Sequence, residues 1–88
     1  DISSVKLLEK VKSLISDEGF IVGNADITVI AQKPKIAPYI PAMRKNIADT
    51  LGIGIERVNV KGTTTENLGF VGRCEGIACE AVCILYRQ

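Results

Sequence analysis

The sequence has 88 residues, of which 47% are hydrophobic and 24% are charged, and its formal net charge is +1. A chain of this length is expected to form one domain, residues 1–88, that is only marginally stable by itself. The near-neutral charge argues against binding to nucleic acid or to an anionic membrane surface, and no apolar run approaches the roughly 20 residues that a membrane-spanning helix needs.

Residues 3 to 18 have the pattern of an amphipathic helix. Ser3 or Ser4 can cap its N-terminus, and Gly19 ends it, because glycine readily adopts the left-handed conformation beyond a helix C-terminus. Lysine and glutamate side chains on the opposite side form a solvated face. The apolar side recurs at helical spacing and consists of Val5, Leu8, Val11, Leu14 and Ile15.

Residues 25 to 32 are predicted to form a strand after a short connection at Gly23 and Asn24. Their side chains alternate with period two, and β-branched residues dominate. The segment Lys33-Pro34-Lys35 breaks the strand, since proline cannot donate a ladder hydrogen bond. Residues 31 to 37 are therefore expected to be the loop that leaves the strand end, a common position for ligands in sheets with helical crossovers.

A second helix is predicted over residues 38 to 51. Pro41 fits in its first turn, where no intrahelical donor is lost, and Gly52 and Gly54 close it. Residues 57 to 63 then form a strand, which is parallel to the first strand if the helix crosses over in the usual right-handed way.

A final strand is predicted over residues 77 to 86, after a loop at residues 64 to 76. Both of its faces are largely apolar, so we expect a helix layer on one face and another subunit on the other. Cys79 and Cys83 lie about 13 Å apart on such a strand, too far for a disulfide, and are expected to be buried as small hydrophobic residues. The expected fold class is α/β, with helices packed on a mixed β-sheet in the order α-β-α-β-β.

The segment from residue 61 to residue 73 carries most of the chemistry. It reads Lys-Gly-Thr-Thr-Thr-Glu-Asn-Leu-Gly-Phe-Val-Gly-Arg. Three consecutive hydroxyls, one carboxylate and one guanidinium suit a phosphate-bearing ligand with a divalent metal. A structural explanation stays open, since threonine is common in strands and the two glycines, Gly69 and Gly72, are ordinary turn residues.

In a β-α-β unit the strand ends at Ala31 and Thr63 lie side by side, so the loops that follow them are expected to share a pocket. The segment from residue 31 to residue 37 offers a small-walled slot with main-chain donors and acceptors that suits a planar base. Lys33 and Lys35 are alternatively solubilising loop charges.

Two long stretches resemble one family. Residues 61 to 82 resemble the C-terminal signature of 2-C-methyl-D-erythritol 2,4-cyclodiphosphate synthases, and residues 23 to 35 resemble that family's other substrate-binding segment. The resemblance covers essentially all 88 residues but only about the C-terminal half of the family. The resemblance implies a homotrimer with active sites between subunits. It also implies that the protein is a phosphorus-oxygen lyase of non-mevalonate isoprenoid biosynthesis, which releases CMP. The location it implies is the bacterial cytoplasm or the plastid stroma.

By this resemblance, several residues acquire roles. Thr64 stabilises the transition state, and Glu66 holds magnesium or manganese between the α- and β-phosphates. Phe70 and Arg73, with Glu75, face a cavity on the threefold axis that accepts an isoprenoid diphosphate; an intersubunit salt bridge between Arg73 and Glu75 is the alternative. The residues that contact cytidine or phosphate are Ala31, Pro34, Lys35, Ile36, Ala37, Thr63, Thr64, Thr65 and Glu66.

The chain also departs from the family. Gly62 stands where the family more often has alanine, and Cys74 where it often has glycine. There is no histidine, so the family's zinc site and its His-Ser-Asp-Gly segment have no counterpart, and the 88 residues alone are expected to be inactive. Two alternatives therefore stay open, a non-catalytic cytidine-nucleotide-binding module and a structural trimerisation fragment.

Overall fold

The computed structural model describes residues 3–88. Its first helix, α1 (Ser4–Asp17), begins at Ser3, whose side chain accepts a hydrogen bond of 3.1 Å from the backbone N–H of Lys6. Gly19, with a φ of 86°, follows the helix end. The predicted helix and its predicted cap are thus confirmed. No residue of α1 is buried.

Strand β1 (Phe20–Ile30) starts five residues before the predicted strand. Gly23 and Asn24, predicted to be a connection, lie inside it, where the ladder to the last strand shifts register between Val22 and Asn24. Such a bulge inserts an extra residue and breaks the period-two pattern, so this part of the strand is not visible as alternation. The ring of Tyr86 lies so close to Gly23 that a Cβ atom would not fit.

The crossover from β1 to the next strand confirms the predicted parallel pair. It runs through a 3₁₀ turn, η1 (Ala37–Tyr39), helix α2 (Ile40–Leu51) and a second 3₁₀ turn, η2 (Ile55–Arg57), into β2 (Val58–Thr63). The register pairs Ala25 with Val58 and Ile30 with Thr63. Proline lies in the first turn of α2, and Gly52 caps its end with a φ of 70°.

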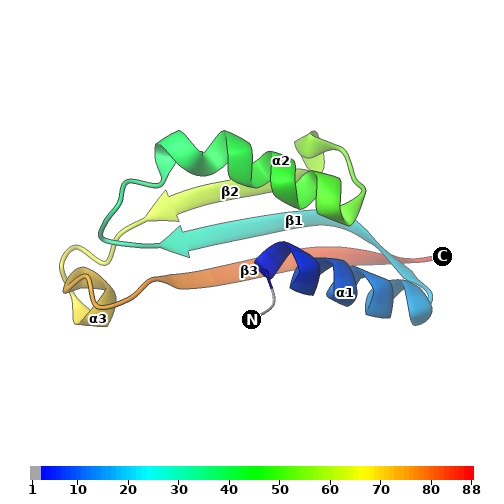
Figure 1. Cartoon of the computed structure of the whole chain (residues 1–88), viewed down its shortest axis with the longest axis horizontal. Helices are drawn as coiled ribbons and strands as arrows, with labels where there is room; N and C mark the ends of the chain where they lie inside the picture. Colours follow the sequence, from blue (N-terminus) through cyan, green and yellow to red (C-terminus); the bar gives the residue numbers. More distant parts are fainter. Residues whose placement is uncertain (1–2) are drawn as a thin grey trace.

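The last strand, β3 (Ala78–Arg87), pairs antiparallel with β1, so that the mixed sheet has the order β2-β1-β3. A single helical turn that the sequence pattern did not predict, α3 (Gly69–Gly72), lies in the preceding loop. Figure 1 shows α3 at the end of the molecule toward which β1 and β2 point, with α2 lying along those two strands. The sheet is therefore covered unevenly.

The core lies between α2 and the strands β1 and β2. Its buried residues are Val29, Ala31, Ala48, Val58 and Val60. Met43 and Ile47 of α2, with Ile27, Ile36, Ile40 and Ile53, pack against this cluster. Arg44 joins α2 to the start of β2, since its Nε donates to the carbonyl of Val58 at 2.8 Å and its Nη2 to the carbonyl of Ile55 at 2.9 Å.

Strand β3 differs from the expectation. Cys79 and Cys83, predicted to be buried, are exposed, and Val82 is 70% exposed. The strand is apolar as predicted, but within residues 3–88 neither of its faces is covered along most of its length. The reason is that α2 packs on β1 and β2, whereas α1, which has no buried residue, leaves a shallow hollow between itself and Leu85.

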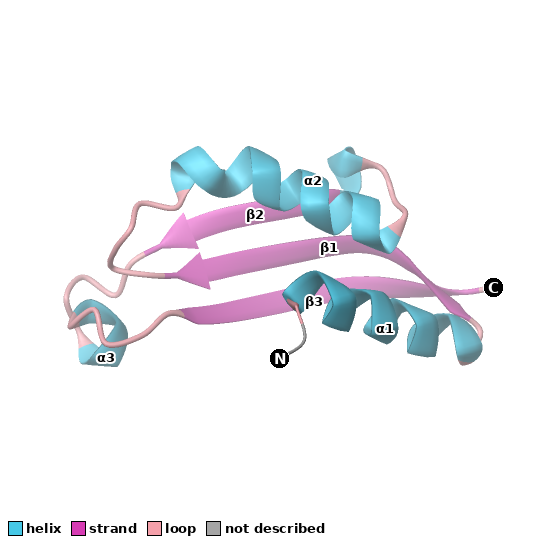
Figure 2. Cartoon of the chain, in the orientation of Figure 1, coloured by secondary structure: helices cyan, strands magenta, loops and turns pink. Residues whose placement is uncertain are grey.

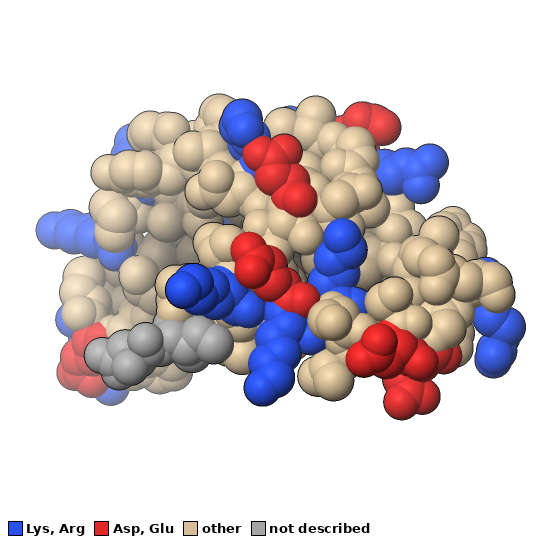
Figure 3. Space-filling view, turned by 45° about the vertical axis from the view of Figure 1, so that its right-hand side comes forward, with Lys and Arg blue, Asp and Glu red and all other residues tan. Residues whose placement is uncertain are grey.

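The surface mixes charges of both signs. Figure 3 shows lysine and arginine side chains interspersed with aspartate and glutamate over one face of the molecule, without a broad basic area. Within residues 3–88, the helices are too short and too polar to cross a membrane.

Candidate functional site

The ends of β1 and β2 are joined, and two loops leave the sheet beside each other. The backbone N–H of Ala31 donates to the carbonyl of Thr63 at 3.0 Å. We call residues 31–37 the proline loop and residues 63–68 the threonine loop. Figure 2 shows both loops at the end of the sheet where the two arrowheads lie. The predicted convergence of the strand ends is therefore observed.

A hollow of about 430 Å³ lies between the proline loop and the end of β2. Ala31, only 3% exposed, is one wall of it. Gln32, Ile40, Val60, Lys61 and Gly62 also line it. The sequence-predicted residues that the structure brings together in this hollow are Ala31, Pro34, Lys35, Ile36, Ala37, Thr63 and Thr64.

Gly62 shapes one side of this hollow. A Cβ atom at this position would lie 2.9 Å from Cβ of Ile36, closer than two side chains normally approach. The absence of a side chain therefore lets Ile36 lie directly against the backbone of β2. An alanine at position 62 would require Ile36 to shift.

The threonine loop is held by its own hydroxyl groups. Thr64 Oγ1 accepts from the backbone N–H of Glu66 at 3.2 Å, and the hydroxyl of Thr65 donates to the carbonyl of Leu68 at 2.6 Å. Accepting a bond leaves the Thr64 hydroxyl hydrogen available for donation to a ligand oxygen. Glu66 and Asn67 both have positive φ, 55° and 68°. Thr65 and Glu66 lie beyond the residues that line the hollow.

A contact that sequence reasoning missed links the two loops. The Gln32 side-chain carbonyl, Oε1, accepts from the backbone N–H of Asn67 at 3.1 Å. On the other side of this turn, the backbone of Gly72 is so close to that of Asn67 that a Cβ atom on Gly72 would overlap it. Gln32 and Asn67 are 35 positions apart, so no local pattern reveals their pairing.

Glu66 carries the carboxylate of the threonine loop. It is exposed, and one carboxylate together with waters and substrate phosphates is a usual way to hold magnesium. A zinc site needs three or four nitrogen, sulfur or carboxylate ligands from the protein. Residues 3–88 contain no such group of three histidine, cysteine, aspartate or glutamate side chains, so this part of the chain does not by itself fit a zinc ion.

The residues assigned to the threefold axis lie around α3, outside the hollow. Phe70 is half exposed. Arg73 makes a two-pronged ion pair with Glu75, with Nε to Oε1 at 2.7 Å and Nη2 to Oε2 at 3.2 Å. Within the single chain described, this ion pair joins residues of the same subunit. A separation of two residues lets the side chains meet locally.

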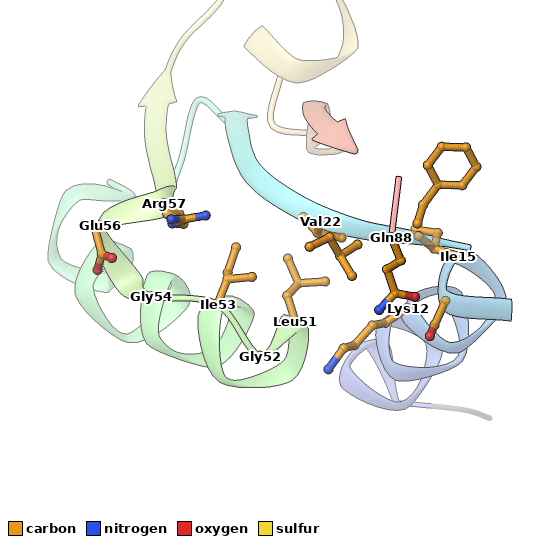
Figure 4. A pocket seen from close by; sticks show the side chains of 13 residues that line it. Lys12, Ile15, Val22, Leu51, Gly52, Ile53, Gly54, Glu56, Arg57 and Gln88 are labelled. Carbon is orange, nitrogen blue, oxygen red and sulfur yellow. The ribbon is translucent and has the colours of Figure 1, made fainter. Parts of the chain in front are cut away.

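A larger hollow of about 590 Å³ lies at the opposite end of the molecule, between α1, β1 and the end of α2. Figure 4 shows Lys12 extending toward Gly52 at the end of α2, beside Leu51 and Val22. A lysine at a helix C-terminus is favourable for the helix dipole, which gives Lys12 a structural role. None of the sequence-predicted site residues lines this hollow.

Comparisons with known proteins agree with one another. A family model described as the YgbB family matches residues 1–86. A 2-C-methyl-D-erythritol 2,4-cyclodiphosphate synthase from Agathobacter rectalis is 60% identical over 84 residues, which are 96% of this chain and 48% of that protein. The chain spans about half the length of the curated relatives it matches.

Two solved structures have the same fold. The 2C-methyl-D-erythritol 2,4-cyclodiphosphate synthase of Plasmodium vivax superposes with a TM-score of 0.92 at 37% identity and covers 98% of this chain and 57% of its own. A CDP complex of IspF from Plasmodium falciparum superposes with a TM-score of 0.90, also at 37% identity, over 98% of this chain and 55% of its own.

Proposed function

Because the chain belongs to the YgbB family, we propose that it provides the cytidine-binding and magnesium-binding part of a 2-C-methyl-D-erythritol 2,4-cyclodiphosphate synthase. The observation that carries the proposal is the hollow between the proline loop and the end of β2, which seven residues named from the family resemblance line together. Relatives with 60% identity are named as synthases, so a nucleotide-binding module without catalysis and a purely structural fragment are not favoured.

The proposed reaction is a phosphorus-oxygen lyase step in non-mevalonate isoprenoid biosynthesis. In 4-diphosphocytidyl-2-C-methyl-D-erythritol 2-phosphate, an oxygen of the 2-phosphate attacks the β-phosphorus. A new phosphorus-oxygen bond closes the ring, the bond to the bridging oxygen breaks, and CMP leaves with that oxygen. Two anions must meet, so catalysis depends on alignment and charge neutralisation more than on an acid or a base.

We assign the binding of the cytosine base to the proline loop, with Ala31, Pro34, Ile36 and Ala37 as walls and Lys35 beside them. Small side chains and free main-chain groups are suited to a planar base. The CDP complex of a relative supports a cytidine nucleotide as the ligand.

The phosphates would lie at the threonine loop. We assign Thr63 and Thr65 to contacts with the phosphates, and the Thr64 hydroxyl donates to the oxygen on which negative charge develops. Glu66 would hold magnesium or manganese, which when bound neutralises the α- and β-phosphates. Zinc, expected for the family, finds no suitable ligand group in residues 3–88, and no step is assigned to it.

The assembly is also part of the proposal. We infer a homotrimer with active sites between subunits, acting in the bacterial cytoplasm or the plastid stroma. The exposed apolar side chains Val82, Ile84 and Tyr86 on one side of β3 support an association surface. Phe70 and Arg73 would bind an isoprenoid diphosphate where three subunits meet, with arginine suited to the diphosphate.

Calorimetric titration with CDP tests the proposed site. We expect magnesium to raise the affinity for CDP. Glu66→Gln should lower the CDP affinity measured with magnesium by at least about 10-fold, an effect of the size seen when interactions at a metal site are lost. Glu56→Gln, an exposed glutamate at the other end of the sheet, is the matched control and should keep the full magnesium effect. CDP binding that is indifferent to magnesium would contradict the assignment of Glu66.

Turnover is tested by CMP release. The 88 residues alone should release no CMP, whereas adding the histidine-bearing part of a longer relative should restore release. Binding without turnover after this addition would favour a nucleotide-binding module, and trimer formation without CDP binding would favour a structural fragment.

A further inference from the structure

Gln32 occupies a fixed position at the exit of β1. The preceding residue, Ala31, is buried, and its backbone N–H is bonded to the carbonyl of Thr63. The backbone that carries Gln32 is therefore held by the last rung of the β1-β2 ladder. Its half-buried side chain extends from this base to the turn of the threonine loop.

The turn that Gln32 reaches is conformationally unfavourable without support. Glu66 and Asn67 are both left-handed, with φ of 55° and 68°. This conformation is unfavourable for a residue with a side chain, although less so for asparagine. Two consecutive residues in this region persist only where their surroundings hold them.

Three contacts supply that support. Thr64 Oγ1 accepts from the N–H of Glu66, Gln32 Oε1 accepts from the N–H of Asn67, and Gly72 packs against the Asn67 backbone. The first and third come from the threonine loop and the adjoining α3. Gln32, which also lines the hollow, supplies the contact that ties this turn to the proline loop.

Resting on the proposed function, we propose that Gln32 is a positioning residue for the metal ligand. By fixing the peptide between Glu66 and Asn67, it sets where the Glu66 carboxylate stands relative to a nucleotide held in the proline loop. A divalent cation can contact this carboxylate and the nucleotide phosphates together only if the proline loop and the threonine loop keep a fixed position relative to each other. Gln32 thus acts through Glu66, and its removal weakens metal binding more than nucleotide binding.

The test compares Gln32→Met, which keeps the length but removes the acceptor, with Gln32→Glu, which keeps an acceptor oxygen. The affinity for Mn²⁺ in the presence of CDP is measured by the paramagnetic resonance signal of free Mn²⁺, and CDP affinity without metal by calorimetry. We expect Gln32→Met to weaken Mn²⁺ binding about 10-fold, as lost outer-shell contacts do, with metal-free CDP affinity changed less than about 2-fold.

Gln32→Glu should recover most of the Mn²⁺ affinity, and Gln32→Ala should repeat the loss with a different side-chain volume. Gln88→Met, at the opposite hollow, is the matched control and should behave as the unaltered protein. Faster exchange of the Asn67 amide proton in Gln32→Met, seen by NMR, would show independently that the turn has lost its support.

Unchanged Mn²⁺ affinity in both Gln32→Met and Gln32→Ala would overturn the inference, as would a Gln32→Glu variant as weak as Gln32→Met. Failure of the proposed function looks different, because then the unaltered protein itself would bind no Mn²⁺ with CDP. That result would remove the premise and the inference together.

Discussion

The β1-α2-β2 unit and the pair formed by α1 and β3 are stabilised in different ways. The first contains the buried cluster, whereas α1 has no buried residue and β3 is exposed over nearly its whole length. Yet β3 pairs with β1 at ten positions. A long hydrogen-bonded ladder therefore does not by itself create a core, because burial depends on what packs on the faces of the sheet.

A matched pair of valine truncations gives the largest expected contrast. Val58 is 1% exposed and Val82 is 70% exposed. Val58→Ala should lower the free energy of unfolding by about 2 kcal/mol, from lost burial plus the cavity left behind. Val82→Ala should change it by less than about 0.5 kcal/mol under conditions where the protein is monomeric. Denaturant midpoints measure both, and equal effects would erase the distinction between the two regions.

Two arginines extend the contrast to polar contacts. Arg44→Leu removes the bonds to the carbonyls of Ile55 and Val58, and we expect a loss of about 1.5 kcal/mol, since bonds from a charged donor are stronger than neutral ones. Arg87 lies over the ring of Phe20, 5.0 Å from its centre. Arg87→Leu should cost only about 0.5 kcal/mol, the value for an exposed cation-π contact. The reverse order in chemical denaturation would contradict this comparison.

The N-terminal cap tests the stability of α1 itself. Ser3→Ala removes the acceptor for the N–H of Lys6 and should destabilise the helix by about 1 kcal/mol. Ser13→Ala, inside the same helix, is the control and should have no such effect. Amide exchange in α1 is the appropriate measurement. Because α1 buries no residue, we expect exchange to rise there before it rises in β1 or α2.

The smallest effect is expected for the surface pair on α2. Lys45 Nζ lies 2.7 Å from Asp49 Oδ2, and this hydrogen bond raises the pKa of Lys45 above its ordinary value of 10.5. A raised pKa in the folded state stabilises the protein at lower pH and ceases to do so as the pH rises past it. Lys45→Gln should therefore leave neutral-pH stability almost unchanged and flatten its dependence on pH above about 10.5. Unfolding titrations of both proteins check this.

The sequence predicted the elements whose signals are local. Helical spacing and the positions of glycines predicted α1 and α2. The helical crossover predicted that β1 and β2 are parallel and that Ala31 and Thr63 lie side by side. The bulge at Gly23 concealed the start of β1, because the bulge interrupts the alternation that marks a strand. Helix α3 has only four residues, too few for helical spacing to be recognised in the sequence.

Other features depend on contacts between distant parts of the chain. The apolar pattern of β3 showed which side chains could be buried but not what covers them, so the expected burial of Cys79 and Cys83 was wrong. In the same way, composition pointed to Glu66 in the threonine loop, while the bond from Gln32 to this loop needed three-dimensional coordinates. The roles assigned to these site residues stay predictions until binding is measured.

The register of β3 turns two of its side chains into chemical reporters. Cys79 and Cys83 pair with Val29 and Ala25, so their thiols lie on the side of the sheet that faces α2, whereas Val82 lies on the other side. Alkylation rates followed by mass spectrometry would thus tell which side of the strand a binding partner occupies. Protection of both thiols identifies the helix side, and retained reactivity in an associated form identifies the Val82 side. Cys74, in the preceding loop, serves as the internal reference.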